Sequence, residues 1–180
     1  VIPEIELPGH SQAAIASYPY LSCKNEKINV SHSWGVFKDI YCAGNASVFT
    51  FLENIFQEIT EIFPSNKIHI GGDEAPKFRW ENCEKCQKRI KDEGIKNEHE
   101  LQNYFIERVA RILERKNKKI IGWDEINESS IKGDVTIQSW RGFTGGSKAV
   151  KEGKKVMMSH RSHCYSGYKI KSCDLGKGYS

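Results

Sequence analysis

Two adjacent acids, Asp73 and Glu74, follow directly on the apolar stretch "KIHIGG" at residues 67–72. The stretch is typical of a short buried strand, in which neighbouring side chains normally point to opposite faces. Gly71 and Gly72 can relax the backbone so that both carboxyl groups reach one pocket. If two neighbouring carboxyl groups differ in proton affinity, one can protonate a leaving oxygen while the other stabilises positive charge. The alternative is a capping or solvent-facing pair, which is the more common role of an isolated Asp-Glu pair.

Other residues that suit carbohydrate chemistry stand just past other apolar stretches. Tryptophan faces pack on the apolar faces of sugar rings, while tyrosine and histidine supply hydrogen bonds. The positions of this kind are His10, Trp123, Glu125, Trp140 and Tyr165. A tryptophan considered alone is more often part of the core. His69, inside the strand before the acids, is equally compatible with a hydrogen-bond network behind them and with a satisfied core histidine.

Helices and short apolar strands alternate along the chain. The pattern predicts strands at 1–7, 67–72, 119–124, 134–140 and 154–159. It also predicts amphipathic helices at 47–63 and from Asn97 onward, where Asn97 and Glu100 form a capping-box pattern, and a short helix at 146–152. Ser11 is expected to cap a short helix that reaches Ala16, and residues 18–46 are expected to form a long loop. Short, wholly apolar strands separated by helices favour a parallel sheet covered by helices.

The positions of the candidate residues distinguish two parallel α/β architectures. Apart from His69, each falls just past the carboxyl end of a successive strand, as in a TIM-type (β/α)8 barrel, whose site is built from the loops at that face. A Rossmann-like open sheet is disfavoured because "GGDE" has neither the GxGxxG spacing nor the lysine of a phosphate-binding loop. We therefore predict an α/β barrel.

The bulk composition limits the class of protein. The 180 residues correspond to one domain, with 38% hydrophobic and 28% charged residues, and no apolar run is long enough to span a membrane. The net charge of +4 comes from basic residues that are not interleaved with stacking aromatics, so solvated surface is favoured over a nucleic-acid site. Because the chain starts at Val1 in a strand pattern, we expect it to be an internal or mature part of a longer protein.

The six cysteines do not predict a metal site. Cys83 and Cys86 form a CxxC pair, but no second CxxC or HxxxH pair accompanies it, so zinc is disfavoured. The surrounding residues "ENCEKCQKRI" are typical of the start of a charged helix, which also disfavours a thioredoxin-like redox pair. Any number of disulfides up to three stays open.

Four motifs together resemble one family of enzymes. "PEIELPGH", "HIGGDE", "IIGWDEI" and "QSWRG" occur in this order and look like those of glycoside hydrolase family 20, the β-N-acetylhexosaminidases, over most of residues 1–165. The resemblance implies that residues 1–180 are a partial catalytic barrel with about strands 3 to 7 of eight. It implies an exported enzyme that removes terminal β-linked N-acetylglucosamine or N-acetylgalactosamine from glycans, with no cofactor and no metal.

The resemblance also assigns roles to the two acids. In this family the substrate's own 2-acetamido oxygen is the nucleophile, in contrast to most retaining glycosidases. Glu74 would be the general acid and later the base, and Asp73 would orient the acetamido N–H and stabilise the charged cyclic intermediate. A negative Asp73 would raise the pKa of Glu74 and keep it protonated.

The remaining matches would form the walls of the sugar pocket. Trp123 and Trp140 would enclose the acetamido methyl group, and Tyr165 would donate a hydrogen bond to the attacking oxygen. Barrel packing is the alternative for these aromatic residues. His10 and His69 would belong to a hydrogen-bond network behind the acids, and His10 would also contact the sugar. Glu125 would form a salt bridge at the rim.

The sequence departs from the family pattern in two places. The family continues its tyrosine as Tyr-x-Asp-Tyr, whereas Gly167 stands at the Asp position here, and residues 166–180 form a divergent tail. The arginine that ends the family's first strand has no counterpart. Two alternatives stay open. One is a sugar-binding remnant of the same fold that has lost turnover, and the other is a metal-dependent amidohydrolase, which the lack of an HxH pair disfavours.

Overall fold

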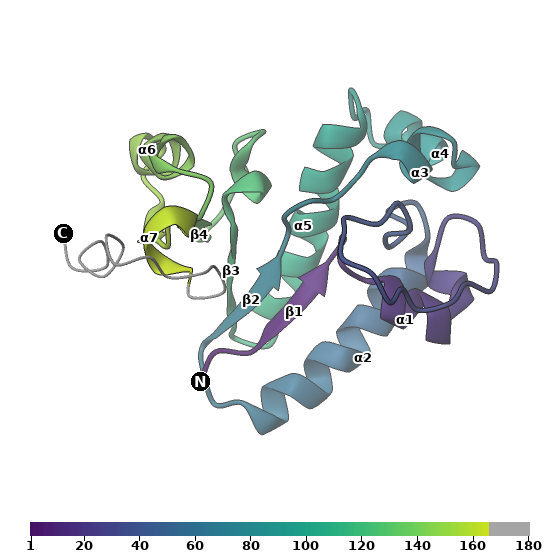
Figure 1. Cartoon of the computed structure of the whole chain (residues 1–180), viewed down its shortest axis with the longest axis horizontal. Helices are drawn as coiled ribbons and strands as arrows, with labels where there is room; N and C mark the ends of the chain where they lie inside the picture. The colour runs from purple at the N-terminus through teal and green to yellow at the C-terminus, as the bar shows by residue number, and fades with distance from the viewer. Residues whose placement is uncertain (166–180) are drawn as a thin grey trace.

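A five-stranded parallel sheet forms the centre of the computed structural model, which describes residues 1–165 (Figure 1). The strands are β1 (Glu4–Leu7), β2 (Lys67–Gly71), β3 (Lys119–Trp123), β4 (Thr136–Ser139) and β5 (Lys155–Met158). Each neighbouring pair is parallel. All five strands lie within the predicted segments, so the predicted α/β class with a parallel sheet is confirmed.

The strand order bears on the choice between the two α/β architectures. A doubly wound sheet reverses its strand order at a switch point. Here the strands follow one another as β1-β2-β3-β4-β5 without a reversal, as in a segment of a barrel wall. Within the described residues the sheet is open, with β1 and β5 at its two edges.

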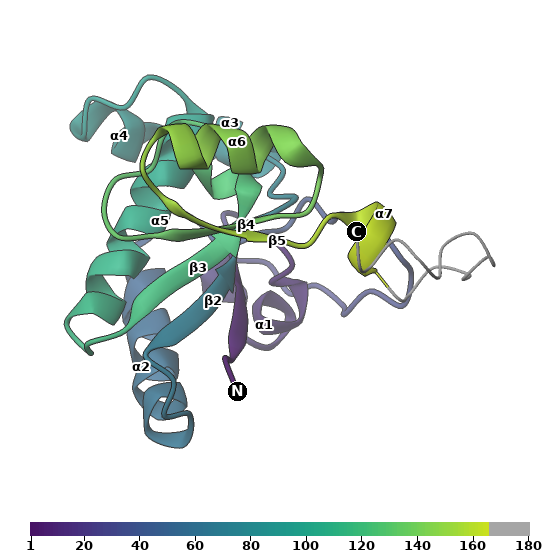
Figure 2. The same ribbon diagram turned by 90° about the vertical axis from the view of Figure 1, so that its left-hand side faces the viewer.

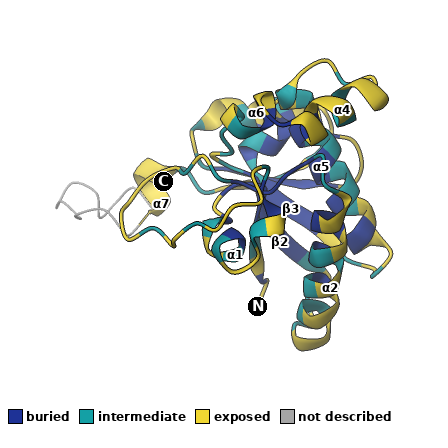
Figure 3. Ribbon diagram, turned by 90° about the vertical axis from the view of Figure 1, so that its right-hand side faces the viewer, coloured by how far each residue is buried: buried dark blue, intermediate teal, exposed yellow. Residues whose placement is uncertain are grey.

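Three helices run along one side of the sheet (Figure 2). They are α2 (Ala46–Ile62), α5 (Glu98–Glu114) and α6 (Phe143–Lys151). Buried side chains of α2 and α5 meet in one core, where the rings of Phe49 and Phe105 lie 4.9 Å apart between centroids. Figure 3 shows that β2 and β3 and the inner helix faces are buried, whereas the outer helix faces are exposed. The faces of α2 and α5 on which the sequence predicts apolar stripes are therefore the faces that contribute to the core.

Asparagine side chains begin the two long helices. Asn45 accepts a hydrogen bond of 3.1 Å from the backbone N–H two residues on, and Asn97 accepts one of 3.0 Å from the N–H three residues on. Both bonds satisfy N–H groups that have no partner inside the helix. The predicted cap at Asn97 is confirmed. Ser11 stands at the N-cap position of α1 (Gln12–Ser17), but the predicted side-chain cap is wrong, because the Ser11 hydroxyl accepts no hydrogen bond from an N–H of α1 and donates one of 2.9 Å to the Pro8 carbonyl.

Short helices occupy the loops that follow the strands. They are η1 (Pro19–Leu21), α3 (Phe78–Glu81), α4 (Glu84–Asp92), η2 (Asp124–Asn127) and α7 (Arg161–Cys164). Apart from the charged start of α4, these segments are too short for a periodic pattern to predict them. No helix in residues 1–165 is long and apolar enough to cross a membrane.

Candidate active site

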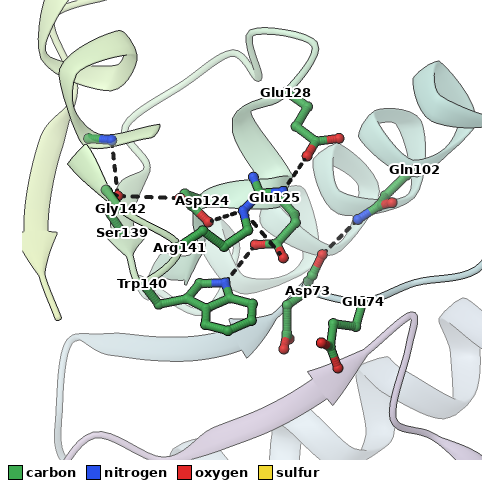
Figure 4. A network of polar contacts seen from close by, with 12 residues as sticks. Asp73, Glu74, Gln102, Asp124, Glu125, Glu128, Ser139, Trp140, Arg141 and Gly142 are labelled. Carbon is green, nitrogen blue, oxygen red and sulfur yellow. Dashed lines mark hydrogen bonds and ion pairs between the residues drawn. The ribbon is translucent and has the colours of Figure 1, made fainter. Parts of the chain in front are cut away.

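Asp73 and Glu74 leave the carboxyl end of β2 on a left-handed backbone. Gly71, Gly72 and Glu74 have φ values of +65°, +96° and +43°. Glycine tolerates this region, whereas it costs other residues roughly 1–2 kcal/mol. A side chain at Gly71 would collide with the carboxyl group of Glu6. The two glycines allow the acids to lie side by side (Figure 4), and a strained acid just past them is typical of a functional site.

His10, from the loop after β1, faces both acids. Its Nε2 lies 3.4 Å from Asp73 Oδ2 and 3.5 Å from Glu74 Oε2. His10 also has a left-handed backbone, with a φ of +49°. The loops after β1 and β2 therefore bring three of the predicted site residues together at the carboxyl edge of the sheet. The three side chains are also close enough to share a metal ion.

Burial dominates the electrostatics of Asp73. Desolvation raises the pKa of Asp73, the charge of Glu74 adds to the rise, and His10 opposes it. Asp73 Oδ1 is buried and has no hydrogen-bond partner among the described residues. Because an unsatisfied buried acceptor costs roughly 1–3 kcal/mol, this oxygen is well suited to accept a hydrogen bond from a bound molecule. The predicted effect of Asp73 on the pKa of Glu74 stays a prediction.

Two further acids, Glu4 and Glu6 of β1, lie next to Asp73. His69 Nδ1 lies 2.9 Å from Glu4 Oε1, and the His69 ring meets Trp123 with centroids 4.9 Å apart. The hydrogen bond to His69 lowers the pKa of Glu4. Burial, and then the charge of Asp73, raise the pKa of Glu6 to about 9. Glu6 is therefore neutral at pH 7, while His69 is both buried and bonded within this network.

Three aromatic side chains form a row: Trp123 at the end of β3, Trp140 directly after β4, and Tyr165 directly after α7. The rings of Trp123 and Trp140 lie edge-on with centroids 6.4 Å apart, and Trp140 stacks on Tyr165 at 6.3 Å. The indole N–H of Trp140 donates a hydrogen bond of 3.0 Å to Glu125 Oε2. The structure thus brings the three predicted aromatic residues together. Such a row can present apolar ring faces to a sugar.

Arg141 links the loops after β3 and β4 (Figure 4). Its Nε lies 2.9 Å from Asp124 Oδ1 and 3.6 Å from Glu125 Oε1, and its Nη1 lies 2.8 Å from Glu128 Oε1. Asp124 is buried, so this cation compensates a charge that is costly to bury alone. Burial raises the pKa of Glu125 to about 7. Arg141 is therefore the salt-bridge partner of Glu125.

Several residues that hold the site are absent from the predicted set. Gln102 of α5 donates a hydrogen bond of 2.8 Å to the Gly72 carbonyl, and Lys77 bonds to the Gln102 side chain. Burial lowers the pKa of Lys77 to about 8. Glu4 and Glu6 could have been found because they alternate with apolar residues and so share one strand face. Gln102 could have been found as a polar residue beside the apolar stripe of its helix.

Two predicted features fall outside the described residues. Gly167, at the position where the family pattern has an aspartate, and the divergent tail at 166–180 both lie beyond residue 165.

The fold is a parallel α/β domain, because its parallel strands follow one another in chain order and helices cover one face. The candidate site lies at the carboxyl edge of the sheet, where the acids and aromatic rings cluster. Comparison with known proteins gives the family. Residues 1–174 match the catalytic domain of glycosyl hydrolase family 20. The chain belongs to this family.

Curated relatives carry the same assignment. The chain is 48% identical over 159 residues to a beta-hexosaminidase of Porphyromonas gingivalis, covering 88% of this chain and 20% of the relative. It is 33% identical over 169 residues to a beta-hexosaminidase of Akkermansia muciniphila, covering 92% of this chain and 34% of the relative. The chain thus spans about a fifth to a third of the length of these relatives.

Solved structures share the fold. A beta-N-acetylhexosaminidase from Bacteroides fragilis superposes with a TM-score of 0.84 at 34% identity, covering 99% of this chain and 38% of that one. An exo beta-N-acetylglucosaminidase of family 20 from Vibrio harveyi, solved in complex with N-acetylglucosamine, gives a TM-score of 0.77 at 28% identity, covering 87% and 25%.

Proposed function

We propose that the protein containing this chain is a β-N-acetylhexosaminidase that releases terminal β-linked N-acetylglucosamine or N-acetylgalactosamine from glycans. The observation that carries the proposal is the meeting of His10, Asp73 and Glu74, in which the buried Asp73 Oδ1 lacks a partner among the described residues. Family membership and the names of the relatives support it. So does the N-acetylglucosamine bound to the structure from Vibrio harveyi.

The proposed reaction is a retaining hydrolysis in which the substrate supplies its own nucleophile. The 2-acetamido oxygen attacks the anomeric carbon while Glu74 donates a proton to the leaving oxygen. Asp73 accepts a hydrogen bond from the acetamido N–H and stabilises the positive charge of the cyclic intermediate. Glu74, now ionised, then takes a proton from the water that opens this intermediate. His10, between the two carboxyl groups, stabilises the ionised forms.

The aromatic row would form the wall of the acetamido pocket. Trp123 and Trp140 pack on the methyl group, and Tyr165 donates a hydrogen bond to the acetamido oxygen as it attacks. Glu125 holds the indole of Trp140 through the N–H bond of 3.0 Å. Behind the acids, Glu4 and His69 hold the floor of the site in place through their 2.9 Å contact.

The architecture proposed for the whole protein is a TIM-type (β/α)8 barrel, to which residues 1–180 contribute about strands 3 to 7. The unreversed strand order and the location of the site at the carboxyl edge support it. Export is the proposed localisation, because extracellular glycans are the substrates that this site fits. Nucleic acid is not a proposed partner.

A comparison of two chromogenic substrates tests the proposal. The full-length protein is expected to cleave an aryl N-acetyl-β-glucosaminide much faster than the matched β-glucoside, which has a hydroxyl in place of the acetamido group. A thiazoline mimic of the cyclic intermediate is expected to inhibit, and a brief exposure to a chelator, long enough to strip a metal from an open catalytic site, is expected to leave the rate unchanged. Thiazoline binding without turnover would identify a sugar-binding remnant, and equal rates on the two substrates would contradict the mechanism.

A further inference from the structure

Four cysteine side chains from three separate segments meet in the loops that follow β1 and β2. They are Cys23, Cys42, Cys83 and Cys86. The Sγ of Cys42 lies 3.7 Å from the Sγ of Cys83 and of Cys86, and the Sγ atoms of Cys23 and Cys86 lie 3.8 Å apart. All four sulfurs lie within 4.8 Å of one another. Cys23 is partly exposed, and the other three are buried.

These distances fit one metal ion better than disulfides. Bonded sulfurs lie about 2.05 Å apart, whereas four thiolates bound tetrahedrally at about 2.3 Å to zinc lie about 3.8 Å from one another. The second spacing is the one found here. An iron–sulfur cluster would hold its thiolates farther apart, because they bind different iron atoms. We propose that Cys23, Cys42, Cys83 and Cys86 bind a single zinc ion.

The backbone around the cysteines is shaped to bring them together. An isolated antiparallel bridge between Ser22 and Tyr41 joins two of the segments, and in each segment a cysteine follows the bridging residue. A Cβ atom on Gly44 would collide with the backbone of Lys85, between the two cysteines of the CxxC turn. The segments therefore touch main chain to main chain, which a chance gathering of apolar thiols would not require.

A site with four protein ligands and no open position is structural, and this one would connect the two loops that carry the acids and histidine. Tyr41, next to Cys42, donates its N–H to the Pro8 carbonyl at 3.0 Å, two residues before His10. The indole N–H of Trp80, in the loop that follows Asp73, donates to the Tyr41 carbonyl at 2.9 Å. Zinc would thus hold in place the loops that position the proposed active site.

Metal analysis of the full-length protein, purified without chelator, tests the proposal directly. About one zinc per chain is expected, with X-ray absorption giving four sulfur ligands at about 2.3 Å. Exchange with cobalt is expected to produce the strong visible absorption of a tetrahedral cobalt thiolate. Less than a tenth of an equivalent after incubation with zinc, iron in place of zinc, or disulfides that pair these cysteines would overturn it.

Matched cysteine variants locate the metal. Cys42→Ser and Cys83→Ser are expected to lower the bound zinc at least tenfold and to lower Tm, because each removes one thiolate ligand. Cys164→Ser, at an exposed free cysteine outside the cluster, is expected to keep both. Zinc retained by Cys83→Ser would contradict the proposal. If a variant fails to fold, the metal count and X-ray absorption of the unsubstituted protein still decide, and both are independent of hydrolase activity.

Discussion

The indole N–H of Trp140 donates a hydrogen bond of 3.0 Å to Glu125 Oε2, and Arg141 holds the other oxygen of Glu125 at 3.6 Å. Glu125→Ala removes the acceptor and releases the indole. If Trp140 encloses the acetamido group, kcat/KM for the N-acetyl substrate is expected to fall about tenfold, the equivalent of one lost hydrogen bond of about 1.4 kcal/mol. Steady-state kinetics measures this change.

Two further variants separate the indole from the ion pair. Glu125→Gln keeps an acceptor oxygen for Trp140 and is expected to lose less than Glu125→Ala. Glu128→Ala removes a carboxylate that contacts Arg141 at 2.8 Å but not Trp140, and it is expected to change kcat/KM little. Equal losses in Glu125→Ala and Glu128→Ala would show that the ion pair, and not the indole, matters.

Glu6 makes stability depend on pH. Its pKa is raised from 4.5 to about 9 in the folded protein, so between these values the native state holds a proton that the unfolded state has lost. Stability contributed by this group is therefore complete below about pH 4.5 and falls as pH rises toward 9. Glu6→Gln removes the dependence, and its Tm is expected to exceed that of the parent by a margin that grows from pH 5 to pH 9.

Glu4 supplies the opposite case on the same strand. The pKa of Glu4 is lowered, mainly by His69, so its contribution is present above the unfolded pKa and is lost as pH falls. Glu4→Gln is expected to be less stable than the parent at pH 7. Thermal melts of Glu4→Gln and Glu6→Gln across the pH range test the two opposite pKa shifts. If both substitutions changed Tm in the same direction at pH 7, the assignment of opposite shifts would be contradicted.

Much of the site could be predicted because parallel strands share an edge. The strand before Asp73 is a short run with buried isoleucines that ends in glycines, so its carboxyl end can be located from the sequence. His10 and Trp123 follow other such runs. Once the sheet is parallel, these residues must lie at the same edge, although nothing in the local pattern states the 3.4 Å between His10 and Asp73.

The features that escaped prediction depend on contacts between distant segments. Cys23 and Cys42 lie in a long loop without periodicity, and only the packing of that loop against the start of α4 brings them to the CxxC pair. A search for paired metal motifs cannot find such a set. The partner of His69 was also hidden, because Glu4 reaches it only through the pairing of β1 with β2, in which Glu4 lies opposite His69.

Gly72 is predicted to be required for steric as well as conformational reasons. Its φ is +96°, and an added Cβ would collide with the Ile126 side chain. Gly133, with a φ of +92° and nothing within 4 Å of an added Cβ, is the matched control. Gly133→Ala is expected to cost about 1–2 kcal/mol for its left-handed backbone, and Gly72→Ala about 1–3 kcal/mol more for the collision. Denaturant unfolding measures both, and similar losses in the two variants would argue against the collision.

The role of Glu74 as proton donor predicts how its removal depends on the leaving group. Glu74→Gln keeps the size of the side chain but supplies no proton, so an aryl glycoside with a basic leaving oxygen is expected to lose about 10²- to 10⁴-fold in kcat/KM. A glycoside whose leaving group departs as a stable anion needs little protonation and is expected to lose far less.

Glu58→Gln, at an exposed position on α2, is the control and should leave both rates unchanged. A plot of log kcat/KM against leaving-group pKa decides the matter, because a donor steepens the slope when it is removed. A uniform drop across the series would mean that Glu74 positions the substrate without giving up a proton.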